Sequence, residues 1–507
     1  MGLYDFAFYH LMCRNAVSFK GRQALLEAEG GLGLDYDQVK LRVDQIAAGL
    51  HKAGVNKGDR ISVLAKNSLD YFTLFGAAAA LGAIMVPVNW RLAPDEIAFI
   101  LKDSAPRILF ADSEHQKTIN ELKGKLTGVE QYYSLGPGHE GFHPFDSLLA
   151  PVGGFTPQEV VSDDGFVIIY TAAVAGRPRG ALLSHGNVLC SSMHFGYHMN
   201  LTSKDVLLNF LPFFHVGGLF MATTCFLVGG LNINMPRFEA GRAVELIEQK
   251  RVSFMMDFAP ILASLLEEHE KSGKNIRSLA SITGIDTKET IEKYEKVTGG
   301  AFHVLYGQTE TSSLATMGPY RERPGSAGKM LLFTEVRLVD DYDRPVSPGQ
   351  VGEIAVRGPM VFKGYWNLPE DTAHTFREGW HHTGDLGRFD EAGFLWYAGR
   401  KAEKELIKPG GENVYPAEVE KVILQHPAVE KTVVLGIPDP KWKEAIKAVC
   451  QLKKGQILDA RALIDFVGER IARYKKPQVV QFVDELPLLQ DGSVDRAKVK
   501  NLYGEAQ

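Results

Sequence analysis

The chain has 507 residues, of which 45% are hydrophobic and 23% charged, and its formal net charge is -5. This composition is ordinary for a globular protein, and the length predicts two or more domains. Neither a basic face nor a block of like charges is visible in the sequence, which argues against a nucleic-acid partner.

Four scattered cysteines are too few for a disulfide framework or a zinc site, and they favour buried thiols in a reducing compartment. The N-terminal segment lacks the basic and apolar regions of a signal peptide. The most apolar stretch, residues 71–88, is rich in alanine and runs into Pro87. That pattern favours a buried helix followed by a strand over a membrane span. We therefore expect a cytoplasmic protein without an integral membrane segment.

Helix and strand signals alternate through the first part of the chain. Residues 35–54 place Val39, Val43, Ile46 and Leu50 on one helical face. Strands are expected at 60–65, 84–88 and 107–112, with helices from about 68 and at 94–103. The same alternation recurs at 205–215, 241–260 and 276–286. It predicts an α/β fold in which parallel βαβ units are covered by helices.

The pattern changes near residue 335. Short runs at 335–340, 352–358 and 393–400, separated by turns, predict an antiparallel β subdomain. A compact α+β tail follows, with helices at 416–426 and 460–476 and strands at 429–437, 445–453 and 479–486. We place the domain boundary so that residues 1–399 form a large N-terminal domain and 400–507 a small, mobile C-terminal domain.

Residues 171–180, TAAVAGRPRG, lie between two apolar runs and have the glycines, proline and basic residues of a phosphate-binding loop. Backbone N–H groups of such a loop can bind an anion, and Arg177 and Arg179 add positive charge. The alternative is a Gly/Pro turn with two solvated arginines. The small apolar residues in the middle of the loop leave both interpretations open.

Two further segments carry groups that suit a nucleotide site. In YGQTET, Tyr306 could stack on a base, Thr309 could bond an anion and Glu310 could hold Mg²⁺. A polar loop with a core tyrosine is the alternative. In HHTGDLG, Asp385 could accept two hydrogen bonds from a ribose diol, or it could close an Asx-turn.

Two more segments combine glycines with a polar residue or a helix start. LPFFHVGG places His215 beside aromatic residues and glycines, where a satisfied core histidine is the alternative to a site residue. KPGGENVYPAEVE has two glycines before a helix that Pro416 would start, and it also reads as a plain strand–turn–helix junction.

Together, in this order, the segments resemble the adenylate-forming superfamily of acyl- and aryl-CoA synthetases, luciferases and nonribosomal-peptide adenylation domains. The resemblance covers nearly the whole chain. It rests on YTAAVAGRPRGALLSHGN, LPFFHVGGL, YGQTET, RPGSAGK, GEIAVRGPMVFKGYW, WHHTGDLG, GRKAEKELIKPGGENVYPAEVE and RYKKP. The last three, with VVLGIPDPKWKEAIKAV, are most similar to the acyl-CoA synthetase branch.

The resemblance implies a two-step reaction that uses ATP, Mg²⁺ and coenzyme A. A carboxylate attacks the α-phosphate of ATP, which gives acyl-AMP and pyrophosphate. The small domain then rotates, and the thiol of coenzyme A displaces AMP to form the thioester. Mg²⁺ and basic groups neutralise the phosphoryl charge, and the rotation lets one cleft serve both steps.

The resemblance also assigns nucleotide-binding positions. Tyr306 corresponds to the residue that stacks on adenine, and Gly284 and Asp286 lie where the family lines the adenine pocket. Asp385 and Arg400 match the pair that binds the ribose.

Other matched positions belong to the reacting groups. Thr309 is similar to the α-phosphate contact and Glu310 to the Mg²⁺ ligand, while His215 lies beside the acyl group. Gly410 and Gly411 match the loop that lines the pantetheine tunnel.

The phosphate loop departs from the family's pattern, roughly T-S-G-T-T-G-x-P-K-G. The outright matches are Thr171, Gly176, Pro178 and Gly180. Arg179 replaces a lysine and keeps its charge, but Ala172, Val174 and Ala175 replace three hydroxyl residues. Hydrogen bonds to charged groups contribute about 1.5–3 kcal/mol each, so triphosphate binding should be weakened.

Two departures lie in the C-terminal domain. Residues inserted before LIK leave the hinge at either Lys401 or Lys404. The family's C-terminal lysine, which acts in adenylation, is Ser493 here, and a neutral hydroxyl does not supply the charge. Lys498 or Lys500 could substitute if the segment is rearranged.

We therefore expect an AMP-forming acyl-CoA ligase whose adenylation step is weak. One alternative is an enzyme that transfers the acyl group to a carrier protein. Another is a degenerate acyl- or nucleotide-binding protein without ligase activity. The sequence does not reveal the acid, and it leaves a homodimer open.

Overall fold

The computed structural model of the chain describes residues 5–138, 140–153, 155–171, 178–401, 406–409, 412, 414–440, 442–488 and 494–505. Most of the phosphate loop, at 172–177 with Gly176, lies outside these residues. So do Lys404, Gly410, Gly411 and Ser493.

The first large sheet has nine strands, and its centre is parallel, as the βαβ pattern predicts. In spatial order the strands are β16 (Lys329–Met330), β15 (Thr316–Pro319), β14 (Ala301–Tyr306), β13 (Ser281–Ile285), β12 (Phe254–Phe258), β10 (Val206–Asn209), β11 (Leu231–Asn234), β1 (Gln23–Glu27) and β2 (Gly33–Asp35).

The second large sheet has eight strands, with parallel pairing from β8 through β4, β3 and β5 to β7. In spatial order they are β19 (Gly364–Tyr365), β9 (Arg179–Ser184), β8 (Gly165–Thr171), β4 (Ile84–Pro87), β3 (Arg60–Leu64), β5 (Ile108–Asp112), β6 (Gln131–Leu135) and β7 (His143–Pro144). β9 returns antiparallel to β8, so both ends of the phosphate loop lie at one edge of this pair.

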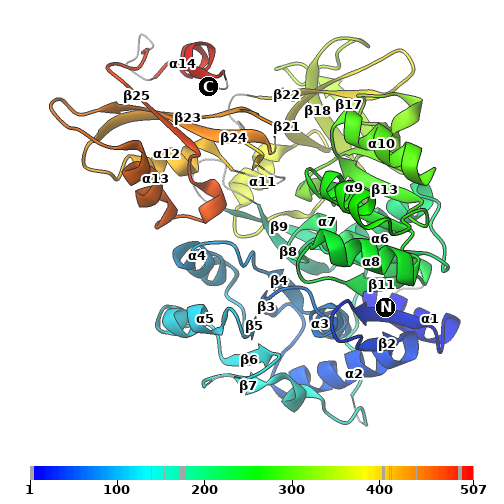
Figure 1. Cartoon of the computed structure of the whole chain (residues 1–507). Coiled ribbons are helices and arrows are strands. Elements are labelled where there is room, and N and C mark those ends of the chain that lie inside the picture. The colour runs from blue at the N-terminus through cyan, green and yellow to red at the C-terminus, as the bar shows by residue number, and fades with distance from the viewer. Residues whose placement is uncertain are drawn as a thin grey trace.

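Helices separate and cover the two sheets (Figure 1). One cluster of buried side chains joins both sheets through helices α1 (Phe8–Ser18), α2 (Tyr36–Lys52), α3 (Leu69–Leu81), α6 (His185–His198) and α7 (Val216–Val228). The alanine-rich α3 is buried on almost every side, because it belongs to this central layer. Outer faces are covered by α8 (Ala240–Lys250), α9 (Ile261–Ser272) and α10 (Lys288–Thr298) on one sheet and α4 (Pro94–Ser104) and α5 (Gln116–Leu122) on the other.

The predicted antiparallel subdomain is also present. Its strands are β17 (Glu335–Val339), β18 (Gly352–Arg357), β21 (Trp380–Phe389), β20 (Phe376–Arg377) and β22 (Leu395–Arg400), and helix α11 (Pro369–Thr375) lies beside them. The pairing of β21 with β22 sets Asp385 opposite Arg400.

The C-terminal domain is a three-stranded sheet with helices on both faces. It contains α12 (Pro416–Ile423), β23 (Val429–Asp439), β24 (Lys443–Leu452), α13 (Ala460–Gly468), β25 (Val479–Val483) and α14 (Arg496–Tyr503). Side chains of α12 and α13 pack on one face and those of α14 on the other. In Figure 1, α13 lies on the side of this sheet that faces α4, and α14 lies on the far side.

One predicted helix is too long. The apolar pattern at 460–476 suggests a single helix, but α13 ends at Gly468. Ile471 and Ala472 that follow are buried, and the Ala472 amide donates to Glu96 of the large domain at 3.1 Å. The apolar residues past Gly468 therefore belong partly to an interdomain contact and not to a continued helix.

The packing separates the two domains. Buried apolar clusters among the described residues draw either on positions 8–395 or on positions 407–503. This confirms the α/β fold with a large first domain and a small second one. Among the described residues, no helix is long and apolar enough to cross a membrane.

Gly284 in β13 gives a test of the sheet next to the predicted adenine pocket. A Cβ at this position would lie 1.9 Å from the carbonyl oxygen of Asp257 on β12. Gly284→Ala should therefore destabilise the protein by about 1–3 kcal/mol, as overpacking does. The melting temperature measures this, with Gly124→Ala as the control because no atom lies within 4 Å of a Cβ there. Equal melting temperatures for the two variants would contradict the packing argument.

Candidate functional site

A cavity of about 120 Å³ lies where the two large sheets, the antiparallel subdomain and the C-terminal domain meet. Strand ends deliver its polar groups: Thr171 ends β8, Arg179 begins β9, and Arg400 ends β22. Of the predicted site residues, those that line this cavity are Thr171, Arg179, His215, Thr309, Glu310, Asp385 and Arg400. Motifs up to 229 residues apart in the chain thus meet at one place.

Asp385 is the most heavily bonded group of the site. Its Oδ1 lies 2.9 Å from Nε of Arg400, while its Oδ2 accepts hydrogen bonds from the Tyr306 hydroxyl at 2.8 Å and the Gln308 amide at 3.2 Å. Burial alone would lower the pKa of Arg400, but the Asp385 carboxylate outweighs burial and raises it. A carboxylate has about four lone-pair sites, so three bonds leave Asp385 one further acceptor position.

Tyr306 is buried, and its ring lies 6.3 Å, centroid to centroid, from the exposed ring of Tyr397 on β22. The two rings are inclined by 30°. Leu305, Gly307 and Gln308, its neighbours in the chain, line the cavity directly. The strand β14 and the loop after it therefore supply the wall next to Asp385.

Thr309 and Glu310 lie in a short 3-10 turn, Thr309–Thr311, that follows β14. The Oε1 of Glu310 accepts a hydrogen bond of 2.7 Å from the hydroxyl of Tyr365. The guanidinium of Arg179 lies 4.1 Å from the centre of the Tyr365 ring and 3.5 Å from Asp371. Its buried Nε has no hydrogen-bond partner among the described residues, so one donor at the cavity is unused.

His215 precedes α7 and caps it, because its Nδ1 accepts the Gly217 N–H at 3.1 Å. Burial, with smaller contributions from the charges of Lys408 and Arg91, lowers the pKa of His215 to about 4. The imidazole is therefore neutral at pH 7. Since Nδ1 is an acceptor, the single ring proton lies on Nε2.

One part of the cavity wall is apolar. It is formed by Val216, Gly217, Met256, Phe258, Ile285 and Leu305. Gly217 leaves room for Met256, whose sulfur would lie 2.9 Å from a Cβ at that position. A ligand held by Thr309 and Asp385 would thus contact these apolar side chains with the part that lies away from both residues.

Four predicted residues that the structure describes do not line this cavity: Tyr306, Gly284, Asp286 and Gly180. Ile285 lines the cavity, whereas Gly284 and Asp286 on either side of it do not. Gly180 lies in β9, where a Cβ would come within 2.6 Å of Ile168.

Sequence reasoning missed several cavity residues. Gln308 lies within a recognised motif, and Lys408 and Tyr415 flank the glycines of KPGGENVY. Tyr365 belongs to the quoted KGYW segment, but its bond to Glu310 joins residues 55 positions apart. All four residues lie within or beside the quoted motifs, and that position was the sequence feature that could have indicated them.

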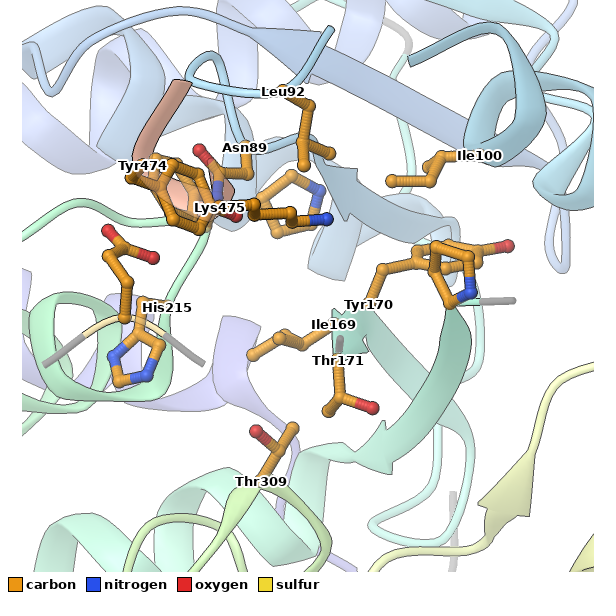
Figure 2. A pocket seen from close by; sticks show the side chains of 14 residues that line it. Asn89, Leu92, Ile100, Ile169, Tyr170, Thr171, His215, Thr309, Tyr474 and Lys475 are labelled. Atoms are coloured by element: carbon orange, nitrogen blue, oxygen red, sulfur yellow. The ribbon is translucent and has the colours of Figure 1, made fainter. Parts of the chain in front are cut away.

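A second cavity of about 70 Å³ adjoins the first and lies between the two domains. Thr171, His215 and Thr309 line both cavities. Figure 2 shows Tyr474 and Lys475 of the C-terminal domain beside Asn89 and Leu92, with Thr171 and Thr309 across the cavity. The small domain therefore closes one side of the site.

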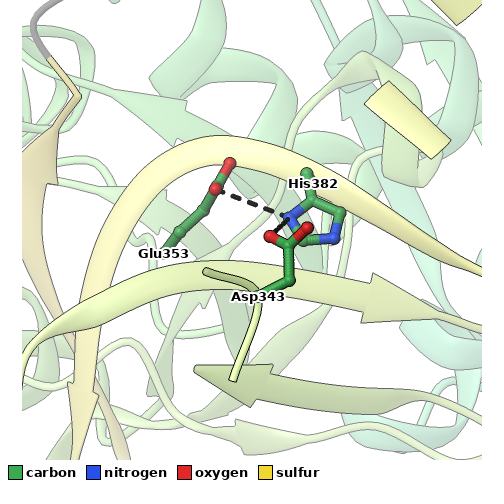
Figure 3. A group of neighbouring side chains, drawn as sticks. All are labelled: Asp343, Glu353 and His382. Atoms are coloured by element: carbon green, nitrogen blue, oxygen red, sulfur yellow. Dashed lines mark hydrogen bonds and ion pairs between the residues drawn. The ribbon is translucent and has the colours of Figure 1, made fainter. Parts of the chain in front are cut away.

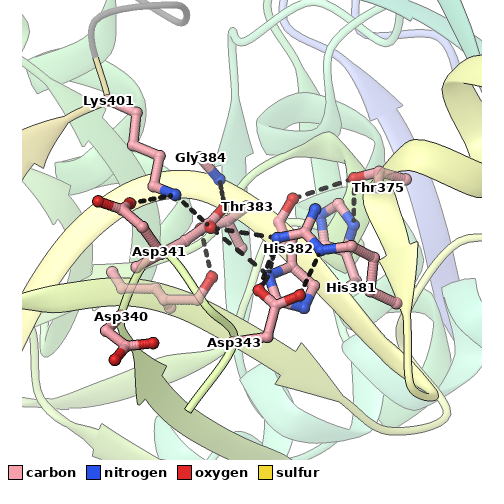
Figure 4. A network of polar contacts seen from close by, with 12 residues as sticks. Asp340, Asp341, Asp343, Thr375, His381, His382, Thr383, Gly384 and Lys401 are labelled. Carbon is pink, nitrogen blue, oxygen red and sulfur yellow. Dashed lines mark hydrogen bonds and ion pairs between the residues drawn. The ribbon is translucent and has the colours of Figure 1, made fainter. Parts of the chain in front are cut away.

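A group of acidic and basic side chains lies at β21 and does not line the cavity. His382 Nδ1 lies 3.5 Å from Glu353 and 3.6 Å from Asp343 (Figure 3). Although this trio has the ligand types of a metal site, it already has cations: Arg377 pairs with Asp343 at 2.8 Å, and Lys401 pairs with Glu353 at 3.0 Å (Figure 4). We interpret it as an ion-pair network.

This network joins the site to the start of the C-terminal domain. Burial alone would raise the pKa of Glu353, but hydrogen bonds with His382, Lys401 and the Gly384 amide lower it to about 2. Lys401 also pairs with Asp341 at 3.2 Å. The residue just past β22, one of two predicted hinge positions, is thus tied to the large domain.

Comparisons with known proteins identify the family. A model of the AMP-binding enzyme family matches residues 13–366, and that of the AMP-binding enzyme C-terminal domain matches 418–492. The chain belongs to the AMP-binding enzyme family.

Individual relatives match nearly the full length of this AMP-binding enzyme. It is 34% identical to a feruloyl-CoA synthase of Amycolatopsis sp, with 94% of this chain and 95% of the relative covered. It is also 34% identical to an indoleacetate–CoA ligase of Aromatoleum aromaticum, with 92% and 93% covered. A doubly substituted o-succinylbenzoate CoA synthetase from Bacillus subtilis, solved with a product analogue, has a TM-score of 0.84 at 28% identity, with 97% and 98% covered.

The described residues fit the nucleotide and metal that the family implies. The carboxylate of Glu310 and the hydroxyls of Thr171 and Thr309 are the hard oxygen ligands that suit Mg²⁺. The unused Nε of Arg179 is a donor for a phosphate oxygen. Asp385 keeps one acceptor position for a ribose hydroxyl.

The Asp385 assignment gives the first test of the site. Asp385→Ala should weaken AMP binding at least tenfold, about 1.4 kcal/mol, because it removes the ribose acceptor and leaves Arg400 unpaired. Titration calorimetry measures the affinity. Asp390→Ala is the matched control, since Asp390 also pairs with an arginine and accepts from Trp396 but does not line the cavity. Unchanged AMP affinity in Asp385→Ala would remove the assignment.

The low pKa of His215 predicts a pH effect on stability. The folded chain holds this proton only below about pH 4, whereas an ordinary histidine binds it below 6.5. The contribution of neutral His215 is therefore complete above pH 6.5 and is lost as the pH falls toward 4.

The melting temperature of His215→Phe should accordingly fall less between pH 7 and about pH 4.5 than that of the wild type. His143→Phe, at an exposed histidine, is the control and should follow the wild type. Identical pH profiles for His215→Phe and the wild type would show that the imidazole is not held neutral.

Proposed function

We propose that this protein is an AMP-forming acyl-CoA ligase. The observation that carries the proposal is the convergence of Thr171, Arg179, Thr309, Glu310 and Asp385 on one cavity that the C-terminal domain closes. A carboxylate oxygen of the substrate attacks the α-phosphorus of ATP, and pyrophosphate leaves. The sulfur of coenzyme A then attacks the acyl carbon, and AMP leaves.

Each side chain has a task in this scheme. Asp385 accepts a ribose hydroxyl, and Arg400 holds that carboxylate in place from the opposite strand. Thr309 and Arg179 donate to the α-phosphate, and Glu310 would hold Mg²⁺, which when bound neutralises phosphate charge. The cavity, at about 120 Å³, is smaller than the roughly 300–1,000 Å³ of common ligand sites, so nucleotide binding requires movement of its walls.

The acid we propose has an apolar, uncharged tail. Its carboxyl group lies near Thr309 and its tail against Met256, Phe258 and Leu305, three uncharged side chains of the lining. Neutral His215 can donate a hydrogen bond from its Nε2–H to the acyl carbonyl oxygen. The names of the relatives above include the feruloyl group and indoleacetate, both of which carry an aromatic ring.

The orientation of the C-terminal domain favours the second step. Lys408 and Tyr415, which flank the predicted pantetheine loop, line the cavity in this arrangement. Helix α14, which carries Lys498 and Lys500, packs instead on the far face of the small sheet. The lysines that could replace a missing group at Ser493 are thus held away from the cavity, and adenylation requires the domain to rotate.

The deciding experiment measures pyrophosphate release from ATP, with and without coenzyme A, over a panel of aryl and aliphatic acids. An acyl-CoA ligase gives an acid-dependent release and a thioester. If a phosphopantetheinyl carrier protein supports turnover and coenzyme A does not, the enzyme acylates a carrier. AMP binding without release would indicate a protein that only binds nucleotide.

The serine at position 493 leads us to expect different rates for the two half-reactions. Acyl-AMP formation from ATP and acid should be slower than thioester formation from supplied acyl-AMP, because the charge of the family's lysine is missing. Rapid-quench kinetics on one preparation compares the two rates.

Ser493→Lys should then raise the rate of ATP–pyrophosphate exchange, with a modest gain because the loop at 172–175 still lacks hydroxyls. Ser493→Gln lengthens the side chain without charge and serves as the control. Adenylation that is faster than transfer in the wild type would overturn this prediction and direct mutagenesis to Lys498 or Lys500.

Three broader expectations stay proposals: a domain boundary at 399/400, a cytoplasmic location and a homodimer. The free cysteines, of which Cys190, Cys225 and Cys450 are buried, agree with a reducing compartment. Light scattering at several concentrations tests the dimer.

A further inference from the structure

Lys475 is a buried lysine at the contact between the two domains. It lies in a 3-10 turn, Arg473–Lys475, between α13 and β25, and its side chain is 2% exposed. Its Nζ lies 2.5 Å from Oε1 of Glu96 and 2.6 Å from Oε1 of Glu418. Glu96 belongs to α4 of the large domain, whereas Glu418 belongs to α12 of the C-terminal domain. One ammonium therefore bridges carboxylates of both domains.

Glu96 is held rigidly on the large-domain side. Its Oε2 accepts the Ala93 N–H at 2.8 Å, which caps the first turn of α4. The same oxygen accepts the Ala472 N–H of the C-terminal domain at 3.1 Å. Both oxygens of Glu96 thus bind across the boundary, and the capping bond fixes where they point.

The charges make this contact specific to the domain orientation. Burial alone would lower the pKa of Lys475, but Glu418 and Glu96 outweigh it and raise the pKa, so the lysine stays charged. Glu418 travels with Lys475 when the domain moves, whereas Glu96 does not. Moving the domain away therefore breaks the Glu96 pair and leaves the Glu418 pair intact. The Glu96 pair forms only in this orientation, so its Coulomb attraction biases the domain toward it.

The same orientation brings the C-terminal domain onto the reaction cavity. Lys475 and Tyr474 line the second cavity together with Thr171 and His215, and Lys408 and Tyr415 line the first. Nearby, Glu412 forms an ion pair with Arg91 of the large domain.

We propose that Lys475 is a positioning residue that docks the C-terminal domain on Glu96 for transfer of the acyl group from acyl-AMP to the thiol. This inference rests on the proposed ligase function. Lys475 itself touches neither reacting atom in this scheme. Its effect is to raise the population of the orientation in which the transfer residues surround the cavity.

Glu96→Gln tests the proposal with little change in shape. Glutamine keeps an oxygen for the amides of Ala93 and Ala472 but loses the charge that Lys475 binds. Thioester formation from supplied acyl-AMP should slow by about tenfold, a usual size for coupling between two states. Acyl-AMP formation from ATP and acid should stay within about twofold of the wild type or rise.

Glu418→Gln is the matched control, because it removes the other carboxylate from the same lysine within one domain. It should lower the melting temperature of the C-terminal domain but keep the ratio of the two half-reaction rates. The proposal is overturned if Glu96→Gln slows both half-reactions equally, or if Glu418→Gln changes their ratio as much as Glu96→Gln does.

A distance measurement separates this proposal from the ligase proposal. Spin labels at the exposed Lys102→Cys on α4 and Arg461→Cys on α13 report the domain separation by pulsed electron resonance. A Cys13→Ser background avoids the one native cysteine that is not buried. Glu96→Gln should broaden the short-distance population and Glu418→Gln should not. An unchanged distance distribution in Glu96→Gln refutes the docking role, whatever reaction the protein catalyses.

Discussion

The ion pair between Asp385 and Arg400 connects the nucleotide side of the cavity to the chain that enters the C-terminal domain. The two residues are opposite one another in the pairing of β21 with β22, so backbone hydrogen bonds fix the distance between them. Arg400 is also the last residue of β22. A ligand that binds Asp385 therefore acts on a carboxylate held by the last residue of β22, next to the proposed domain boundary. A change in the path of the chain beyond β22 therefore reaches the site through this pair, and also through Lys408 and Tyr415, which line the cavity directly.

Acidic side chains share cations in two separate places, one in the antiparallel subdomain and one at the contact between the domains. Behind β21, Lys401 and Arg377 neutralise Glu353 and Asp343. Across the boundary, Lys475 serves two carboxylates and leaves one negative charge in excess. The first set links elements of the large domain to the hinge region, and its two cations serve three carboxylates because Lys401 also pairs with Asp341. The second is under-compensated, so separation of the domains exposes Glu96 to water and leaves a balanced pair behind. Solvation of Glu96 then offsets part of the lost Coulomb energy, which keeps such a contact reversible.

Much of the fold is predictable from local pattern. Apolar strands bounded by turns and helices with one apolar face gave the α/β class, and the change near residue 335 gave the antiparallel subdomain. Seven of the predicted site residues line one cavity, because strand ends of parallel sheets gather at one edge. The helix at 460–476 is the counterexample: Ile471 and Ala472 fit a helical pattern, but Ile471 packs in the core of the C-terminal domain and the Ala472 amide binds Glu96 of α4. A sequence pattern predicts that a residue is buried, but it does not predict which residues bury it.

Contacts between distant segments account for what sequence reasoning missed. Glu96 and Lys475 are 379 positions apart, and nothing in either local segment specifies the other. In its local sequence Glu96 indicates only a capped helix start, and Lys475 is one of several basic residues of RYKKP. Only the docking of the domains reveals that the capping carboxylate has a second task. A capping carboxylate suits that task because its helix has already fixed its side chain, so little rotamer entropy is lost when the other domain arrives.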